Sequence, residues 1–155
     1  MSTWKQAIRE GLVSGSLASI FSATWLAWAG RRSGMPAAPL NAVSHWIFGD
    51  RSLQEDTPSL RYTATGYLTH HAASVFWGVL HAKLWGAKPV AKEPLPAAAG
   101  AVAAAGIACF VDYQLTPKRL TPGFEHRLAK PDMTAVYACF AVGLLAGSLL
   151  MKGRR

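Results

Sequence analysis

The sequence predicts an all-α membrane protein, with four transmembrane helices in a compact bundle and short interfacial helices in the two longer loops. The chain of 155 residues is 51% hydrophobic and only 15% charged. Long windows carry no charge, and about 20 apolar residues suffice to cross a bilayer. Lys and Arg stand at the ends of these windows rather than in a stripe. We therefore expect one four-helix transmembrane domain over residues 1–155, and we assign its net charge of +8 to contact with membrane lipids and not with nucleic acid.

The first predicted crossing, residues 8–30, is rich in small side chains. Gly11, Gly15, Ala18 and Ser22 fall on one face of a helix. Small residues allow the backbone of a second helix to approach closely. We expect another helix to pack against this face.

The first longer loop follows, and most of it is expected to be ordered. Apolar residues recur at helical spacing over 40–47, and Gly49 can end a short helix there. We predict that this helix lies in the membrane interface. His45 falls on a different side of it, so we expect a surface histidine.

The second predicted crossing, residues 62–85, belongs to a helix that Thr57 can cap and that ends at Gly86. It carries three of the five histidines, which are His70, His71 and His81. A histidine inside the hydrocarbon layer usually faces a partner or a wet cavity.

Helical geometry limits what these histidines can do together. His70, Ser74, Trp77 and His81 share one face. His70 and His81 are about 16 Å apart along the axis, so they cannot bind one metal ion together.

The third predicted crossing, residues 95–115, is dominated by Ala and Gly. Such a thin helix suits the middle of a tight bundle. Asp112 falls in its last turn, where the helix dipole disfavours a negative charge. We expect a partner such as Lys118, Arg119 or a histidine. The alternative is a solvated carboxylate at the helix end.

The second longer loop and the fourth crossing complete the chain. We predict a brief interfacial helix over 122–130 and a crossing over 133–151 that Asp132 caps. Gly143 and Gly147 form a GxxxG spacing, which favours close packing within the bundle or between copies. Four basic residues could hold lipid phosphates or could be ordinary charged flanks; they are Lys118, Arg119, Arg127 and Lys130.

Four crossings place both termini on one side. Each side then carries eight of the sixteen Lys and Arg residues, but the terminal side concentrates its eight in shorter loops. The positive-inside rule therefore favours cytoplasmic termini. We expect a multi-pass protein of a bacterial inner membrane.

One polar constellation emerges near the outer face. His70 or His71 could join Asp112 to handle protons or a polar ligand. With Cys109 and Cys139 added, the same residues could bind a zinc or copper ion. The alternative is that each histidine satisfies its hydrogen bonds locally, for example with serine, threonine or a backbone carbonyl.

The sequence contains no GxSxG, P-loop or HExxH motif. The leading expectation is a non-enzymatic accessory protein or a self-associating bundle, with a homo-oligomer or another membrane protein held through the small-residue faces. The alternative is a protein that handles a small solute, protons or metal ions through the His/Asp/Cys cluster. A third is a lipid-modifying enzyme, with Asp112 and a histidine as an acid–base pair and Arg119 near a phosphate.

Overall fold

The part of the chain that the structure describes is mainly helical. This computed structural model describes residues 3–152, and no strand occurs in that range. The α-helices are α1 (Trp4–Arg32), α2 (Ala38–Val43), α3 (His45–Phe48), α4 (Thr65–His81), α5 (Pro94–Phe110) and α6 (Lys130–Leu150). The π-helical turns Leu60–Ala64 and Ala82–Gly86 extend α4 at both ends, and Val111–Leu115 extends α5. The 3-10 helices are Asp50–Gln54, Pro89–Lys92, Lys118–Leu120 and Phe124–His126.

Three of the helices are long and apolar enough to cross a membrane. They are Trp4–Arg32, Pro94–Leu115 and Lys130–Leu150. They correspond to the first, third and fourth predicted crossings. The segment around α4 is not among them, and its three histidines lower its hydropathy.

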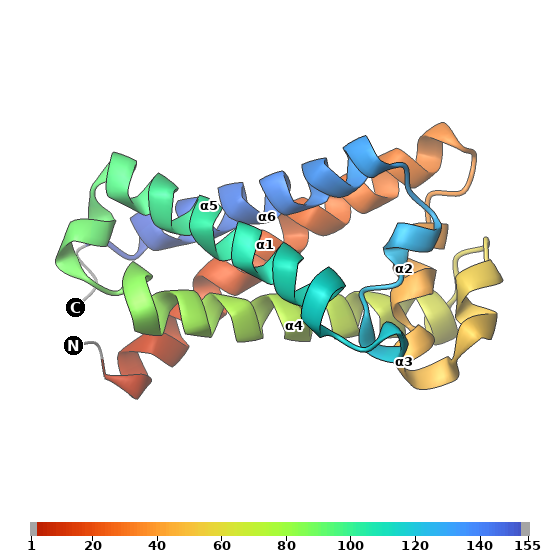
Figure 1. Cartoon of the computed structure of the whole chain (residues 1–155), viewed down its shortest axis with the longest axis horizontal. Helices are drawn as coiled ribbons and strands as arrows, with labels where there is room; N and C mark the ends of the chain where they lie inside the picture. The colour runs from red at the N-terminus through yellow and green to blue at the C-terminus, as the bar shows by residue number, and fades with distance from the viewer. Residues whose placement is uncertain (1–2, 153–155) are drawn as a thin grey trace.

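The long helices lie side by side and define two ends of the molecule (Figure 1). Helix α1 begins and α6 ends at one end, which we call the terminal end. Helices α2 and α3 lie at the other, which we call the loop end. Polar contacts across α1 and α4 give their register: Gln6 donates to the Ala87 carbonyl near the terminal end, and Ser22 bonds His70 nearer the loop end. The two helices therefore run antiparallel along a shared length.

Helix α1, and not α5, occupies the centre of the molecule. Of the most apolar window in each helix, 44% is buried in α1 and only 22% in α5. The expectation that the Ala-rich helix would be central was wrong. Alanine makes a helix thin, but it adds little side-chain surface to bury. Helix α1 instead has small residues on two faces, so two neighbouring backbones can approach it.

The first of these faces packs against α4, as the small residues of α1 predicted. A Cβ added at Gly15 would lie 2.6 Å from the Cα of Val75. A Cβ added at Gly78 of α4 would lie 2.7 Å from the carbonyl oxygen of Gly11. Side chains larger than hydrogen would push these helices apart.

The second face packs against the GxxxG segment of α6. A Cβ added at Gly143 would overlap the backbone of Ala18, and one added at Gly147 would overlap the backbone of Ser14. The sequence left open whether this motif acts within the chain or between copies. In this fold it joins α6 to α1.

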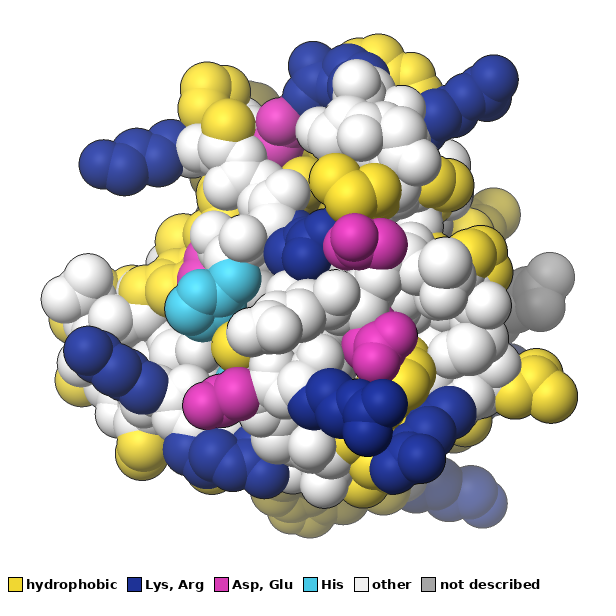
Figure 2. Space-filling model, turned by 90° about the vertical axis from the view of Figure 1, so that its right-hand side faces the viewer, with side chains coloured by type: hydrophobic (Ala, Val, Ile, Leu, Met, Phe, Trp, Pro, Cys, Tyr) yellow, Lys and Arg dark blue, Asp and Glu magenta, His cyan; other side chains and the backbone are white. Residues whose placement is uncertain are grey.

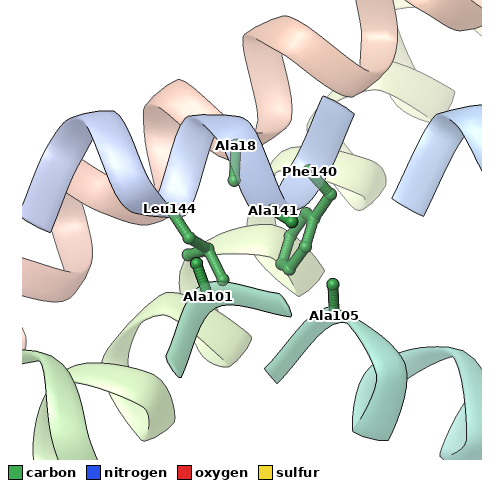
Figure 3. Packing of buried hydrophobic residues seen from close by; sticks show 6 residues of the cluster. All are labelled: Ala18, Ala101, Ala105, Phe140, Ala141 and Leu144. Atoms are coloured by element: carbon green, nitrogen blue, oxygen red, sulfur yellow. The ribbon is translucent and has the colours of Figure 1, made fainter. Parts of the chain in front are cut away.

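Larger side chains of α6 fill the space on the α5 side. Phe140 and Leu144 project from α6 toward Ala105 and Ala101 of α5 (Figure 3). Leu144 is fully buried and Phe140 is 6% exposed. The alanines of α5 thus serve as flat contact sites for the large side chains of α6.

The first longer loop folds inward at the loop end. All residues of α2 are buried, so α2 does not lie flat on the outside of the bundle. His45 is only 2% exposed, and its Nε2 lies 2.7 Å from the Thr121 carbonyl oxygen. The expectation of a surface histidine was therefore wrong. The second loop covers His45 and supplies its partner.

Two predicted helix caps also differ. Ser59, not Thr57, caps the helix that leads into α4, because its hydroxyl accepts from the Tyr62 backbone N–H. Helix α6 begins at Lys130, which places Asp132 in its first turn and not at the cap. The brief helix predicted over 122–130 is a single 3-10 turn, Phe124–His126, and residue 130 already belongs to α6.

Basic and acidic side chains are interspersed over the loop end (Figure 2). Arg32 pairs with Asp132, and Arg127 pairs with Asp56. These ion pairs join segments far apart in the chain. The loop end is therefore a surface of mixed charge rather than a uniformly basic one.

Candidate functional site

A cavity of about 480 Å³ opens between α4, α5 and α6, toward the loop end. Most of its wall is apolar and includes Phe76, Trp77 and Phe140. Trp46, Leu120 and other residues of the loop end border it. Two residues of the predicted polar constellation, His70 and Asp112, line this cavity. A largely apolar cavity with a few polar groups is typical of small-molecule sites.

His70 is held by helix α1. Its Nε2 lies 2.8 Å from the hydroxyl of Ser22. That hydroxyl donates its single hydrogen to the Ala18 carbonyl at 2.7 Å, as serine often does inside a helix. We assign the hydrogen of the neutral imidazole to Nε2, which donates to Ser22. Nδ1 is then a hydrogen-bond acceptor.

Asp112 is held by helix α6. The Tyr137 hydroxyl donates to its Oδ2 at 2.6 Å. Neither Lys118, Arg119 nor a histidine fills the predicted partner role within the described residues. The sequence reasoning missed Tyr137, because nothing local links a tyrosine of the fourth crossing to a carboxylate 25 positions earlier.

The polar wall of the cavity therefore presents mainly acceptors. Asp112 lines the cavity with a carboxylate, and the His70 imidazole, whose Nδ1 is an acceptor in the assigned tautomer, also lines it. Neither Lys nor Arg lines the cavity among the described residues. Such a wall favours a ligand group that donates hydrogen bonds, for example a hydroxyl or an ammonium group, and disfavours an anion.

His70 and Asp112 make separate hydrogen bonds. His70 contacts Ser22, and Asp112 contacts Tyr137. The geometry thus shows no acid–base pair of the kind that the enzyme hypothesis needs, although both groups border one space.

The other members of the predicted constellation lie outside this cavity. His71 packs its ring against Tyr67, with 5.8 Å between the ring centroids. Cys109 and Cys139 are partly buried and form no disulfide. Over residues 3–152, no three His, Cys, Asp or Glu side chains come close enough to hold a metal ion. The zinc or copper hypothesis therefore has no geometric support.

Two of the four basic residues predicted at lipid headgroups bind the protein itself. Arg119 donates to the carbonyl oxygens of His45 and Trp46, at 2.5 and 3.0 Å. Arg127 donates to the Leu53 carbonyl at 2.9 Å in addition to its ion pair. Both residues tie the second loop to the first. The other two residues of the predicted group, Lys118 and Lys130, are exposed, as is Arg119 itself.

A second buried polar cluster lies at the terminal end. Lys92 forms an ion pair with Glu10, and it also donates to the Ser148 carbonyl at 3.1 Å. Gln6 donates to the other Glu10 oxygen at 3.1 Å. The sequence reasoning missed this cluster. A carboxylate inside the predicted first crossing was the available signal, because an intramembrane charge implies a partner.

A family-model scan, a search of curated proteins and a search of solved structures each give no match to this chain.

Proposed function

We propose that this chain is a small membrane protein that crosses the bilayer four times, with α4 as the remaining crossing. Helix α4 runs antiparallel to α1, from the Ser22–His70 contact to the close approach of Gly78 and Gly11. The chain then returns to the terminal end, where Lys92 meets Glu10. This return supports α4 as a crossing, and two of its histidines lie against protein, because His70 bonds Ser22 and His81 is 5% exposed.

The same proposal includes a bacterial inner membrane and cytoplasmic termini. Its support is the density of Lys and Arg in the shorter loops of the terminal side. Reporter fusions at the C-terminus and in the loop around Asp50 test the orientation. A cytoplasmic signal from the loop fusion would contradict it.

We infer that the protein binds a small amphipathic molecule whose head group carries a hydroxyl or an ammonium. The observation that carries this inference is the cavity of about 480 Å³, which is apolar except near His70 and Asp112. The apolar wall suits a hydrocarbon portion, and the acceptors suit a donating head group. This develops the small-solute hypothesis of the sequence analysis.

The accessory or self-associating role stays a prediction. It rests on the lack of a catalytic motif and on the small-residue faces of α1 and α6, and these faces pack against one another and against α4 within the chain. Small residues that stay exposed lie on α5 instead, at Ala99, Ala103 and Gly106.

Photoaffinity labelling tests the binding proposal. The full chain in lipid nanodiscs is exposed to a medium-chain primary alcohol with a diazirine beside the hydroxyl. We expect labelling on residues that line the cavity, competed by the matching primary amine and not by the matching carboxylic acid. Equal competition by the acid, or labelling spread over lipid-facing residues, would contradict the proposal.

Two variants sharpen this test. Ala73→Phe fills the cavity and should abolish labelling, whereas Ala138→Phe adds the same side chain at an exposed position of α6 outside the cavity and should not. Asp112→Asn removes the charge. It should weaken competition by the amine by roughly 10- to 150-fold, since a hydrogen bond to a charged group contributes about 1.5–3 kcal/mol.

A further inference from the structure

A second cavity, of about 490 Å³, lies in the crevice between α4 and α5 toward the terminal end. Trp77 lines both this cavity and the first one. On α4 and its extension, the first cavity uses residues 69–77 and the second uses 77–85. On α5 and its extension, the first uses 108–112 and the second uses 99–107.

The two cavities therefore follow one another along a single crevice. Helices α4 and α5 are antiparallel. Going from the first cavity to the second, the lining residue numbers therefore rise along α4 and fall along α5. Trp77 lines both cavities, so they meet at this side chain. The sequence had already placed His70, Trp77 and His81 on one helix face, and this face borders the crevice over about 16 Å.

The chemistry of the second cavity differs from that of the first. Its walls are apolar apart from His81, which is 5% exposed, and Trp85, whose indole N–H already donates to the Pro96 carbonyl at 3.0 Å. No carboxylate lines it among the described residues. It offers space for hydrocarbon and no acceptor comparable with Asp112.

The outer rim of the second cavity faces the surroundings of the protein. Leu84 and Ile107 line it and are 69% and 57% exposed. In a bilayer these side chains meet lipid tails, so a hydrocarbon chain can lie in the crevice without contact with water. The two cavities together approach the upper volume of roughly 1,000 Å³ for small-molecule sites.

We propose that the second cavity holds the distal hydrocarbon chain of the amphiphile whose head group lies at Asp112. This rests on the proposed function and extends it, because it identifies the ligand as a long single-chain alcohol or amine rather than a compact molecule. The chain passes Trp77 and must reach about 16 Å from the level of His70 to that of His81. Both cavities are lined by Trp77, so one molecule can extend from the first into the second. For this reason we choose the tail of the bound amphiphile as the occupant rather than an independent lipid tail.

The experiment uses two isomers of one long-chain primary alcohol, with the full chain in lipid nanodiscs. One isomer carries a diazirine beside the hydroxyl, and the other carries it at the end of the chain. We expect the first to label the wall around Asp112 and Tyr137. We expect the second to label residues 99–107 or 80–85. Tail labelling confined to the first cavity or to residues outside the crevice would overturn the inference.

A matched pair of variants separates filling of the cavity from a general effect on α5. Ala103→Phe fills the second cavity and should reduce tail labelling there at least severalfold, while labelling beside the hydroxyl persists. Val102→Phe adds the same ring at a position that is 65% exposed and lines neither cavity, and it should change neither signal. Equal tail labelling in Ala103→Phe and the wild-type protein would overturn the inference.

Two further outcomes separate this inference from the proposed function. Absence of labelling beside the hydroxyl at the first cavity would contradict the proposed function, and the inference with it. Labelling there without tail labelling in the second cavity would overturn the inference alone. Asp112→Leu removes the acceptor for the hydroxyl, so tail labelling that persists at full strength in this variant would identify an independent lipid chain and would also overturn the inference.

Discussion

Lys92 and Glu10 form an ion pair across 82 positions of the chain, with side chains only 6% and 7% exposed. The pair joins the 3-10 helix before α5 to the first turns of α1, and Lys92 also contacts the Ser148 carbonyl of α6. It therefore ties three segments together at the terminal end. A buried pair of this kind need not add net stability, but loss of one partner leaves an uncompensated charge.

Lys92→Met should lower the free energy of unfolding by about 3–5 kcal/mol, because Glu10 is then buried without its partner. The double variant Glu10→Leu/Lys92→Met should recover most of that loss. Unfolding in mixed micelles measures both. The exposed pair of Lys152 and Glu93 is the control, and Lys152→Met should cost less than about 1 kcal/mol. A double variant as unstable as Lys92→Met would contradict the role of an uncompensated charge.

Substitution by alanine should lower the free energy of unfolding at Gly143 and leave it unchanged or raise it at Gly106. Gly143→Ala introduces a Cβ that overlaps the Ala18 backbone, so the helices must separate, and we expect a loss of about 1–3 kcal/mol. A Cβ at Gly106 meets nothing within 4 Å. Gly106→Ala should be neutral or stabilising by up to about 1 kcal/mol, because alanine favours the helix. The same unfolding measurement compares them, and equal losses would argue against close packing of α6 on α1.

Removal of the hydroxyl should change the free energy of unfolding at Tyr137 but not at Tyr113. Tyr137→Phe removes the hydroxyl that donates to Asp112, and we expect a loss of about 1–3 kcal/mol. Tyr113 packs its ring against Tyr137, with 6.2 Å between the centroids, but its hydroxyl has no hydrogen-bond partner within residues 3–152. Tyr113→Phe should therefore leave the free energy of unfolding nearly unchanged. Both variants keep the aromatic ring, so a similar loss for both would contradict a specific contribution of the Asp112 hydrogen bond to the free energy of unfolding.

Loss of the Arg119 side chain should destabilise the loop end more than loss of the neighbouring Lys118 side chain. Arg119→Met removes the donors to the His45 and Trp46 carbonyls, and each such bond contributes about 1.5–3 kcal/mol. Lys118→Met removes an exposed charge and should have little effect. Hydrogen exchange of the segment around His45 should increase in the first variant only. Equal exchange in both would assign Arg119 to the surface, as the headgroup hypothesis supposed.

The candidate site was predictable in part. The sequence placed His70 and Asp112 at similar depth, and both line one cavity. It did not reveal Tyr137 as the partner of Asp112, and for the histidines it offered only serine, threonine or a backbone carbonyl in general, of which Ser22 is the one that bonds His70. It also grouped Cys109 and Cys139 with them, and those side chains lie outside the cavity. Depth along a helix follows from counting residues, but the direction of a side chain around the bundle depends on how the helices are rotated.

The sequence by itself determined the helical class, the three helices that are long and apolar enough to cross a membrane, and the small-residue contacts of α1. Hydrophobic length and side-chain size act locally, so they can be read along the chain. Only the tertiary structure decided that α1 is central, that His45 is buried beneath the second loop, and that Lys92 meets Glu10. These features depend on contacts between residues that are 76 and 82 positions apart. No local pattern specifies such pairs, because many arrangements bury the same apolar surface and only the packing of the whole bundle selects one.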